Sequence, residues 1–461
     1  MFSIVRQLSF LSTDRDAGNV PAASAVSGNG VVFSRSKQTL GGSDVGMVAT
    51  IDGQEHLVKT GISRSQLGQA VTCCLNGQVD QANKRFGYIA DGAARLLNTG
   101  PRQGNQKQVL TQAFHTFLRT EKGKELAEKA KTHALDIADV GDIHSALIEA
   151  EPQLRNTLGV PVLFDVINVA AGQQLVNALQ GTYLPKQHIP DSSLLAVQNN
   201  ALIASRLIAD ARPLDTFLTE PFLPPGVSLK DAKRAAALLK GTAAAGSAQS
   251  DDHARAQALI AKINDPTNLD AGKQALRKTL EQKGLDGLFV SLLARFTLGE
   301  SSDLGPDNML VVPGEDGRNK AVSIDVTGFR YTRQNDVPAG PRDPPRHGWG
   351  KVIDTPALAL DVLLDGSVMS SRYAKGLDAV HAAVVDCLRD ALRLKATPEA
   401  EAVKRWYAAL DVDASTASLL ALHQGLGDIA TAPWMPDAGL VSQVLERNAG
   451  FINDIVQRAR T

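Results

Sequence analysis

The chain of 461 residues is 43% hydrophobic and carries 48 Lys and Arg against 49 Asp and Glu, for a formal net charge of -1. This length predicts a sizeable core in about two or three globular units, and the balanced charge lacks the basic excess of a dedicated nucleic-acid-binding protein. The three cysteines, Cys73, Cys74 and Cys387, are too few and too badly spaced for a disulfide framework or a Cys/His zinc site. These classes are therefore excluded, and a reducing compartment is expected.

The N-terminus lacks the apolar core of a cleaved signal peptide, and no run of about 18 apolar residues predicts a membrane span. We expect a soluble protein without a transmembrane segment. Residues 13–30 are rich in Ser, Ala, Gly and Asn, which favours a flexible leader over residues 1–28 of the kind that non-cleaved bacterial secretion systems use. A frayed terminus is the alternative.

Strand patterns come first along the chain. The candidate strands are residues 30–34, 46–51 and 54–59. Asp52 and Gly53 separate the last two strands and predict a two-residue hairpin turn, because Gly adopts a positive φ without strain.

Helical periodicity dominates afterwards. Leu, Ala and Phe recur at spacings of three and four over residues 108–151, which predicts two surface helices, and a further helix is expected at 165–179. Residues 201–208 indicate a buried strand, although so short an apolar run does not distinguish strand from helix. Residues 241–252 are small and polar and predict a loop, and the chain after Pro356 is nearly all helical in pattern. This order predicts an α+β protein with a small sheet at the front.

The first candidate site is a glycine-rich segment before the second candidate strand, followed by Lys59 at the end of the third. The segment contains Gly41, Gly42, Ser43 and Gly46. Glycines let backbone amides approach phosphate oxygens, and a Lys one strand further on supplies a charge for the phosphates of ATP. Leu57 and Lys59 share one face of the strand, which suits an adenine ring and its phosphates. A structural hairpin with an incidental Lys is the alternative.

The second candidate site pairs an acidic with an amide side chain. Asp303 is followed directly by Leu304, and Asn308 stands five positions beyond the Asp, before an apolar run. Phosphoryl transfer needs a carboxylate to accept the proton of the substrate hydroxyl and an oxygen ligand for a metal ion. Asp303 and Asn308 are suited to these roles, and a Pro-containing turn capped by the two residues is the alternative.

The third candidate site is Asp325, at the end of a second apolar run. Residues 309–313 and 320–325 are expected to pair as a hairpin across 314–317, which returns Asp325 to the side of Asn308. A metal that bridges ATP phosphates takes oxygen ligands from two such residues. We therefore predict a Mg²⁺ or Mn²⁺ site here; a polar residue that merely ends a strand is the alternative.

In this order, the three segments resemble the motifs of the protein-kinase-like superfamily, in which an Asp, a following Leu and an Asn five positions on form the catalytic loop. The chain is more similar to the divergent eukaryotic-like kinases among effectors secreted by pathogenic bacteria, which share features with phosphoinositide kinases. The resemblance spans residues 30–329, with insertions. It implies a bilobal fold, with a small antiparallel sheet in an N-lobe over 29–212 that carries a helical insertion at about 105–160. A large, mainly helical C-lobe would cover 213–461 and contain the catalytic segment 301–329.

The resemblance also implies roles for single residues. The implied catalytic and metal-binding residues are Asp303, Lys59, Asn308 and Asp325. Residues 201–218 are similar to the strand and hinge that contact adenine, which assigns Ser205 and Leu207 to cofactor binding. Residues 287–296 are similar to the helix that leads into the catalytic loop.

Three features depart from the family pattern. The helix at 165–179 contains no Glu to pair with Lys59. The candidate replacements are Asp165, Asn168, Glu121, Glu125 and Glu149. Ser301 and Ser302 replace the His-Arg before the catalytic Asp, and Thr327 stands where the family has the Gly of D-F-G.

The leading functional hypothesis is a kinase that transfers the γ-phosphate of ATP to a hydroxyl of a protein or a phosphoinositide. The resemblance and the Ser-rich leader add an effector role in a host cell, with a host protein as a candidate activator. Two alternatives stay open. The same fold can host AMP transfer or glutamylation, because fold does not fix chemistry, and the chain can instead be a non-catalytic helical binding protein or pseudokinase.

Overall fold

The computed structural model describes residues 26–27, 31–36, 46–96, 103–132, 135–197, 200–245, 251–298, 308–326 and 377–460. Within these ranges the protein is α+β and mainly helical, with a small, largely antiparallel sheet near the N-terminus, as the order of sequence patterns predicted. Most of the predicted leader, most of the glycine-rich segment and the segment around Asp303 lie outside the described residues, and residues 26–27 of the leader form a short strand.

The larger sheet has the strand order β1-β5-β6-β4-β3-β2. Only the short β1 is parallel to its neighbour among these pairs, and the remaining neighbours are antiparallel. The strands are β1 (Val26–Ser27), β2 (Val32–Ser36), β3 (Gly46–Ile51), β4 (Gln54–Lys59), β5 (Ser192–Val197) and β6 (Asn200–Arg206).

The β3–β4 hairpin confirms the clearest local prediction. Both strands have the expected bounds, and the turn residues Asp52 and Gly53 both have positive φ, 50° and 76°. Two positive φ values give a turn whose twist matches that of the flanking strands. The first predicted strand is shifted, because β2 begins at Val32 and not at residue 30.

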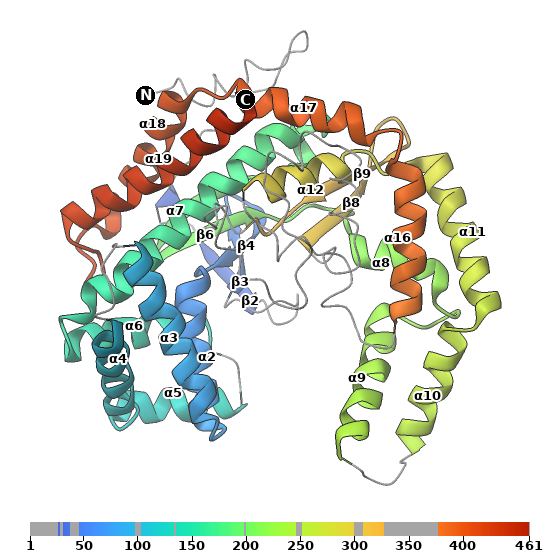
Figure 1. Ribbon diagram of the computed structural model, residues 1–461. Coiled ribbons are helices and arrows are strands. Elements are labelled where there is room, and N and C mark those ends of the chain that lie inside the picture. Colours follow the sequence, from blue (N-terminus) through green and yellow to red (C-terminus); the bar gives the residue numbers. More distant parts are fainter. Residues whose placement is uncertain are drawn as a thin grey trace.

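A group of helices separates β4 from β5 and stands to one side of the sheet (Figure 1). They are α2 (Ile62–Leu75), α3 (Val79–Leu96), α4 (Gln103–Phe117), α5 (Glu121–Thr132), α6 (Ile137–Ala150) and α7 (Leu154–Gln180). The prediction of two surface helices over 108–151 was wrong, because three helices cover this range. Thr120 and Asp136 start new helices within this range. The Thr120 hydroxyl accepts the Gly123 N–H at the start of α5, and Asp136 forms a reciprocal capping box with Asp139 at the start of α6.

The 27-residue α7 is the central helix of the protein. It contacts β5, β6 and β9 as well as helices on both sides of the larger sheet. By length and composition it could cross a membrane, which the sequence pattern had not indicated, but 83% of its apolar window is buried inside the protein. Its apolar surface is therefore used in packing within the fold.

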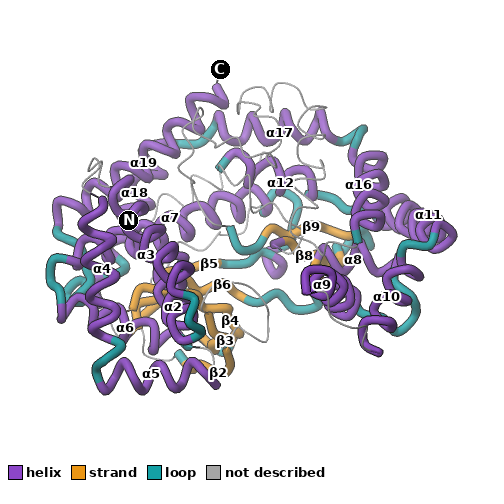
Figure 2. The backbone as a smooth tube through the Cα atoms, turned by 60° about the horizontal axis from the view of Figure 1, so that its bottom comes forward, coloured by secondary structure: helices purple, strands orange, loops and turns teal. Residues whose placement is uncertain are grey.

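A second group of elements follows β6 and stands on the other side of the sheet (Figure 2). It contains β7 (Arg212–Pro213), α8 (Leu214–Thr219), α9 (Leu229–Ala245), α10 (Asp251–Ile263), α11 (Pro266–Lys283), α12 (Leu288–Thr297), β8 (Met309–Pro313) and β9 (Asn319–Ser323). The predicted loop at 241–252 was partly wrong, because α9 extends to Ala245 and α10 begins at Asp251. Strands β7, β8 and β9 form a small antiparallel sheet in that order.

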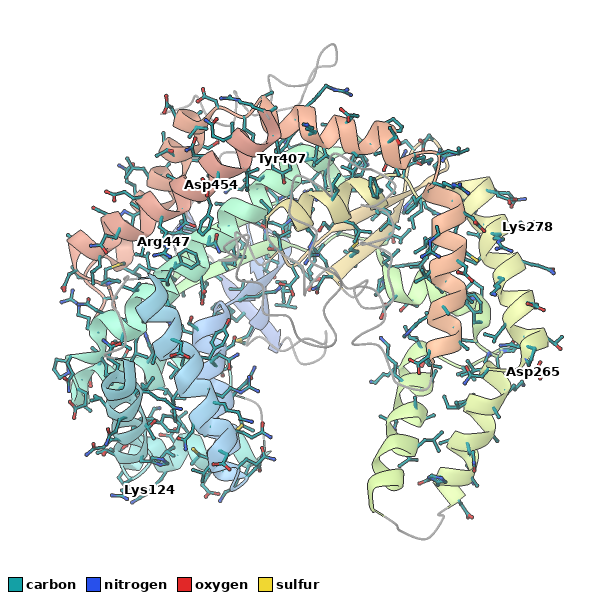
Figure 3. The ribbon with its side chains drawn as sticks, viewed as in Figure 1. Lys124, Asp265, Lys278, Tyr407, Arg447 and Asp454 are labelled. Carbon is teal, nitrogen blue, oxygen red and sulfur yellow. The ribbon has the colours of Figure 1, made fainter. Side chains whose placement is uncertain are left out.

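The C-terminal helices are α16 (Asp378–Leu392), α17 (Ala396–Ala408), α18 (Val412–Gln424) and α19 (Ala438–Arg460). The last three pack on α7 and α12, and the hydroxyl of Tyr407, labelled in Figure 3, donates to the Ala294 carbonyl on α12 at 3.1 Å. Arg447 reaches from α19 to the Leu96 carbonyl at the end of α3. The C-terminal helices therefore connect the two sides of the fold.

A close backbone approach joins α7 to the segment before α19. A Cβ added at Gly159 would overlap the carbonyl oxygen of Trp434, whose side chain is fully buried. Arg155, one turn earlier, donates to the Met435 carbonyl at 2.6 Å. Only a residue without a side chain allows this contact.

We predict that Gly159→Ala destabilises the protein by about 1–3 kcal/mol, because the added methyl group forces α7 away from Trp434. Gly92→Ala is the matched control: Gly92 lies in α3, and a Cβ there meets nothing within 4 Å. It should stabilise the protein by about 0.5–1 kcal/mol through helix propensity. Urea unfolding measures both, and equal effects of the two variants would contradict the packing argument.

Candidate functional site

The structure brings Lys59 and Asp325 together from positions 266 residues apart. Lys59 ends β4 in the interior of the larger sheet, and its Nζ donates to Oδ1 of Asp325. The lysine side chain is 10% exposed, whereas the aspartate side chain is 31% exposed. The pair therefore has a buried cationic end and an anionic end that solvent reaches.

The β8–β9 hairpin positions Asp325 beside Asn308, as predicted. Met309 pairs with Ser323, so that Asn308 and Ile324 stand opposite each other one step further on. The Ile324 N–H donates to the Asn308 carbonyl at 3.0 Å. The two candidate metal-binding residues consequently lie at the same end of the hairpin.

Asp325 adopts a backbone conformation that side chains disfavour. Its φ is +55°, and of the described residues outside Gly only Asp52 and Asp210 share a positive value. Such a conformation costs on the order of 1 kcal/mol and persists where neighbouring groups determine it. Here Gln173 Oε1 accepts the Val326 N–H at 3.2 Å, and Arg295 donates to the Ile324 carbonyl at 3.1 Å.

Arg295 of α12 is fully buried beneath the hairpin end. Its guanidinium donates to the carbonyls of Asn308 at 3.0 Å and Ile324 at 3.1 Å, and it approaches the Asp325 carbonyl at 3.5 Å. Sequence reasoning missed this residue. A signal was present, because Arg295 continues the apolar stripe of Leu288 and Leu292 at spacings of four and three.

Amide side chains on α7 hold the hairpin from the other side. Gln180 Oε1 accepts the Ser323 N–H at 2.5 Å, and Gln173 Nε2 donates to Asn177 Oδ1 at 2.8 Å. Asn177 in turn donates to the Pro190 carbonyl before β5 at 2.7 Å. These three buried residues recur at spacings of four and three in an otherwise apolar helix, which the sequence analysis did not use.

The acidic partner expected for Lys59 on α7 has another role. Asp165 Oδ2 accepts the Ser63 N–H at 2.7 Å and so caps the start of α2. Glu121 and Glu125 are exposed and pair with Lys124 and Lys122 respectively. Proposing these two glutamates as partners of Lys59 was therefore wrong.

The two remaining candidates for the Lys59 partner are Glu149 and Asn168. Glu149 is exposed on α6, and Asn168 is buried in α7. Within the described residues, the carboxylate paired with Lys59 is that of Asp325.

The predicted cofactor residues on the sheet lie around Lys59. Gly46 pairs directly with Lys59, and Ser205 pairs with Leu57, so that Leu57, Lys59 and Ser205 share one face. The Ser205 hydroxyl lies 2.9 Å from that of Ser192, and the Leu207 N–H donates to the Glu55 carbonyl at 2.9 Å. Both groups are thus engaged within the sheet.

Four predicted site residues lie outside the described part of the chain: Gly41, Gly42, Ser43 and Asp303. The structure brings together Lys59, Gly46, Asp325 and Asn308. Within the described residues, no three His, Cys, Asp or Glu side chains form a metal-binding group. The predicted ligands are instead one carboxylate and one amide, whose oxygens are of the type that Mg²⁺ binds.

A second buried arginine lies just after Lys59. Arg64 is 1% exposed, donates to Asn200 Oδ1 and to His144 Nδ1, and lies 5.0 Å from the ring centroid of Trp434. Burial lowers its pKa to about 9. Burial and the neighbouring Arg64 charge hold the pKa of His144 well below its usual value. Arg64 thus ties the first turn of α2 to β6 and to the C-terminal segment.

An ionic cluster fixes the other end of the hairpin. Asp286 accepts two hydrogen bonds from Arg318, at 2.7 and 2.9 Å, and contacts Lys320 and Lys395 at 3.2 and 2.7 Å. The Arg318 hydrogen bonds and the two ammonium groups hold the pKa of Asp286 far below its ordinary value, against the effect of burial. The cluster joins β9 to α12 and α17.

Comparisons with protein-family models, with curated proteins and with solved structures give no match to this chain.

We predict that Arg295→Met destabilises the protein by at least about 3 kcal/mol, because buried carbonyl oxygens lose their donor. Arg277→Met is the control. Arg277 is 46% exposed and pairs with Asp390 on the surface, so its removal should change the free energy of unfolding by less than about 1 kcal/mol. Urea unfolding distinguishes the two, and a small effect at Arg295 would contradict its assigned role.

We predict a pH-dependent effect of Glu399→Gln. Burial, with help from Asp286, raises the pKa of Glu399 to about 7 despite Lys395. A carboxyl whose pKa is raised on folding costs no stability below its unfolded pKa, because it is protonated in both states. The free energy of unfolding then falls as the pH rises from the unfolded pKa through the folded pKa. Relative to the native protein, Glu399→Gln should therefore gain about 1–2 kcal/mol between pH 5 and pH 8, allowing for partial exposure.

Chemical denaturation at the two pH values measures this difference. Glu401→Gln, an exposed position on the same helix, serves as the control and should show no such trend. A Glu399→Gln variant with the same relative stability at pH 5 and pH 8 would refute the assignment.

Proposed function

We propose that this protein binds Mg²⁺-ATP at the Lys59–Asp325 site and transfers the γ-phosphoryl group to a hydroxyl of a protein or a lipid headgroup. The observation that carries the proposal is the ion pair between these two residues. Both residues were predicted for this chemistry from the sequence, and they lie 266 residues apart. Their meeting supports the proposal because the prediction named both of them before their contact was known.

The order of elements supports the same function. A hairpin, β3–β4, is followed by a helical region and then by β5 and β6, with β6 placed directly beside β4. Further along the chain, α12 leads towards the β8–β9 hairpin that ends at Asp325. This is the order that the kinase-like resemblance implies, with the helical insertion lying between β4 and β5.

Each residue has a defined task in this proposal. Lys59 would contact the phosphates, and oxygens of Asp325 and Asn308 would hold a metal ion, whose charge would stabilise the negative charge of the transferring group. The bond from the γ-phosphorus to the β,γ-bridging oxygen breaks, and a bond to the acceptor oxygen forms. The acceptor proton goes to the carboxylate of Asp303, the role that its position before Leu304 suggests.

Burial of the ion pair favours an exchange of partners on nucleotide binding. Lys59 is nearly inaccessible, so removing Asp325 without a replacement would leave a buried cation unpaired, which is costly. A phosphate oxygen would supply that replacement and would leave the more exposed Asp325 available to hold a metal ion. Both charges then stay compensated throughout binding.

Two other functions are compatible with the same site. AMP transfer or glutamylation would use the same ATP-binding residues, and mass spectrometry of the acceptor distinguishes phosphoryl, adenylyl and glutamyl products. A non-catalytic binding protein would show no turnover. The proposal of phosphoryl transfer rests on the Asp303 spacing.

We predict that Mg²⁺-ATP raises the unfolding temperature of the intact protein and that Asp325→Ala and Lys59→Met abolish this increase. Asp303→Ala should keep the increase but lower turnover by at least about 100-fold, because it removes only the proton acceptor. Differential scanning fluorimetry and an ATP-turnover assay measure the two effects. The turnover assay is repeated with eukaryotic cell extract, because a host protein is a candidate activator.

Asp316→Ala is the matched control, since Asp316 lies in the turn of the same hairpin and pairs with Lys320 on the surface. It should leave nucleotide stabilisation unchanged. Absence of stabilisation by ATP with either Mg²⁺ or Mn²⁺ would exclude the proposal, and stabilisation without any turnover would favour the binding-protein alternative.

A further inference from the structure

A polar groove lies on the helical insertion, between α3 and α4. It has a volume of 850 Å³. Its lining residues are Asn83, Lys107, Gln108, Thr111, Gln112, His115, Thr116 and Arg119. None of these residues belongs to the Lys59–Asp325 site, so the groove is independent of the proposed function.

The groove has a positive charge without a compensating acid. Lys107 and Arg119 carry permanent charges, and no carboxylate is among the lining residues. Neither cation forms an ion pair within the described part of the chain. By contrast, Lys124 and Lys131 on the adjacent α5 pair with Glu121 and Glu128 at 2.6 and 2.5 Å. In a chain with a net charge of -1, this is a local excess.

Hydrogen-bonding groups follow the groove at regular spacing. Lys107, Thr111, His115 and Arg119 are each four residues apart and form one stripe along α4 and the turn that follows it. At 1.5 Å per residue the stripe is about 18 Å long. An extended peptide rises about 3.3 Å per residue, so that about five or six residues would fit along it.

The side-chain amides add a second set of donors and acceptors. Those of Asn83, Gln108 and Gln112 make no hydrogen bond to other described residues. An amide that both donates and accepts is suited to a peptide backbone, which presents N–H and C=O groups in alternation. The groove thus offers charge for acidic side chains and amides for the main chain.

The two helices that carry the groove pack on each other beneath its lining residues. Phe86 of α3 and Phe114 of α4 are fully buried, with ring centroids 4.9 Å apart, and Phe114 also contacts Phe117. The opposite face of α4, including Leu110, is buried in the core. A ligand would therefore meet a preformed surface and lose little free energy to ordering it.

We propose that this groove binds an extended, acidic segment of a partner protein. Two permanent cations in a concave, amide-rich surface suit a short acidic peptide. A nucleic acid would call for a longer row of cations that neutralises many phosphates. A membrane surface would call for apolar side chains beside the basic ones, and the lining residues include no aliphatic or aromatic hydrocarbon side chain.

Fluorescence anisotropy with fluorescein-labelled hexaglutamate tests this proposal. Lys107→Glu/Arg119→Glu should weaken binding at least tenfold, and raising the salt concentration should weaken binding to the intact protein. Lys230→Glu/Lys278→Glu is the control. It changes the net charge by the same amount at two exposed positions, Lys230 on α9 and Lys278 on α11, of which Lys278 is labelled in Figure 3. This control should change the affinity by less than twofold.

Equal losses in the two double variants, or no binding of hexaglutamate at millimolar concentration, would overturn the proposal. So would binding of phosphatidylserine vesicles that the groove variant loses while hexaglutamate stays unbound, since this points to a membrane surface. Thermal unfolding verifies that the variants fold. If the charge reversal prevents folding, Lys107→Gln/Arg119→Gln replaces it, with the same expected loss.

Discussion

The contact between Lys59 and Asp325 requires that an interior strand of one sheet and the end of a separate hairpin meet within one ion pair. A partly buried pair is stabilising only where its geometry is maintained, because both ions have lost water. Two side chains that are not acidic, Arg295 and Gln173, maintain the geometry of the pair. Arg295 holds the carbonyls on either side of the hairpin end, and Gln173 accepts the N–H that follows Asp325. The conformation of Asp325 is therefore determined from both sides and does not depend on the pair alone.

The two buried arginines satisfy the same electrostatic requirement in different ways. Arg295 is surrounded by backbone carbonyls, which are fixed by the hairpin and accept several of its hydrogen bonds. Arg64 has one amide oxygen, one imidazole nitrogen and the face of Trp434, and its pKa falls to about 9. A cation–π contact and a neutral histidine compensate a buried charge less completely than a set of carbonyls. Arg64 lies in the first turn of α2, directly after β4. Its contacts with Asn200, His144 and Trp434 therefore hold the end of the strand that carries Lys59.

Local signals predicted β3 and β4 with their bounds, because the two-residue turn Asp52-Gly53 and alternating side chains specify them without reference to the rest of the chain. The β8–β9 hairpin was also predicted, but its second strand runs from Asn319 to Ser323 and not from 320 to 325. Strand β5 was missed, since its apolar run follows a turn-rich segment and pairs mainly with β6, a relation that only the fold reveals. The number of helices between β4 and β5 depended on single capping residues such as Asp136. The partner of Lys59 was sought on α7, and Asp165 does lie near the start of α2. Asp165 accepts the Ser63 N–H, because α2 begins at Ile62 and its first turn lies against α7.

The polar positions of α7 that contact the hairpin carry amides and no acid. Gln180 accepts from the Ser323 N–H and approaches the Ser323 carbonyl as a donor, and Gln173 does the same for the Val326 N–H and the Ser323 carbonyl. A carboxylate accepts only, so that at either position it would remove one of the two donors of the Ser323 carbonyl and place a second negative charge near Asp325. Amides on α7 therefore bind the hairpin through its backbone without competing with Asp325 for Lys59.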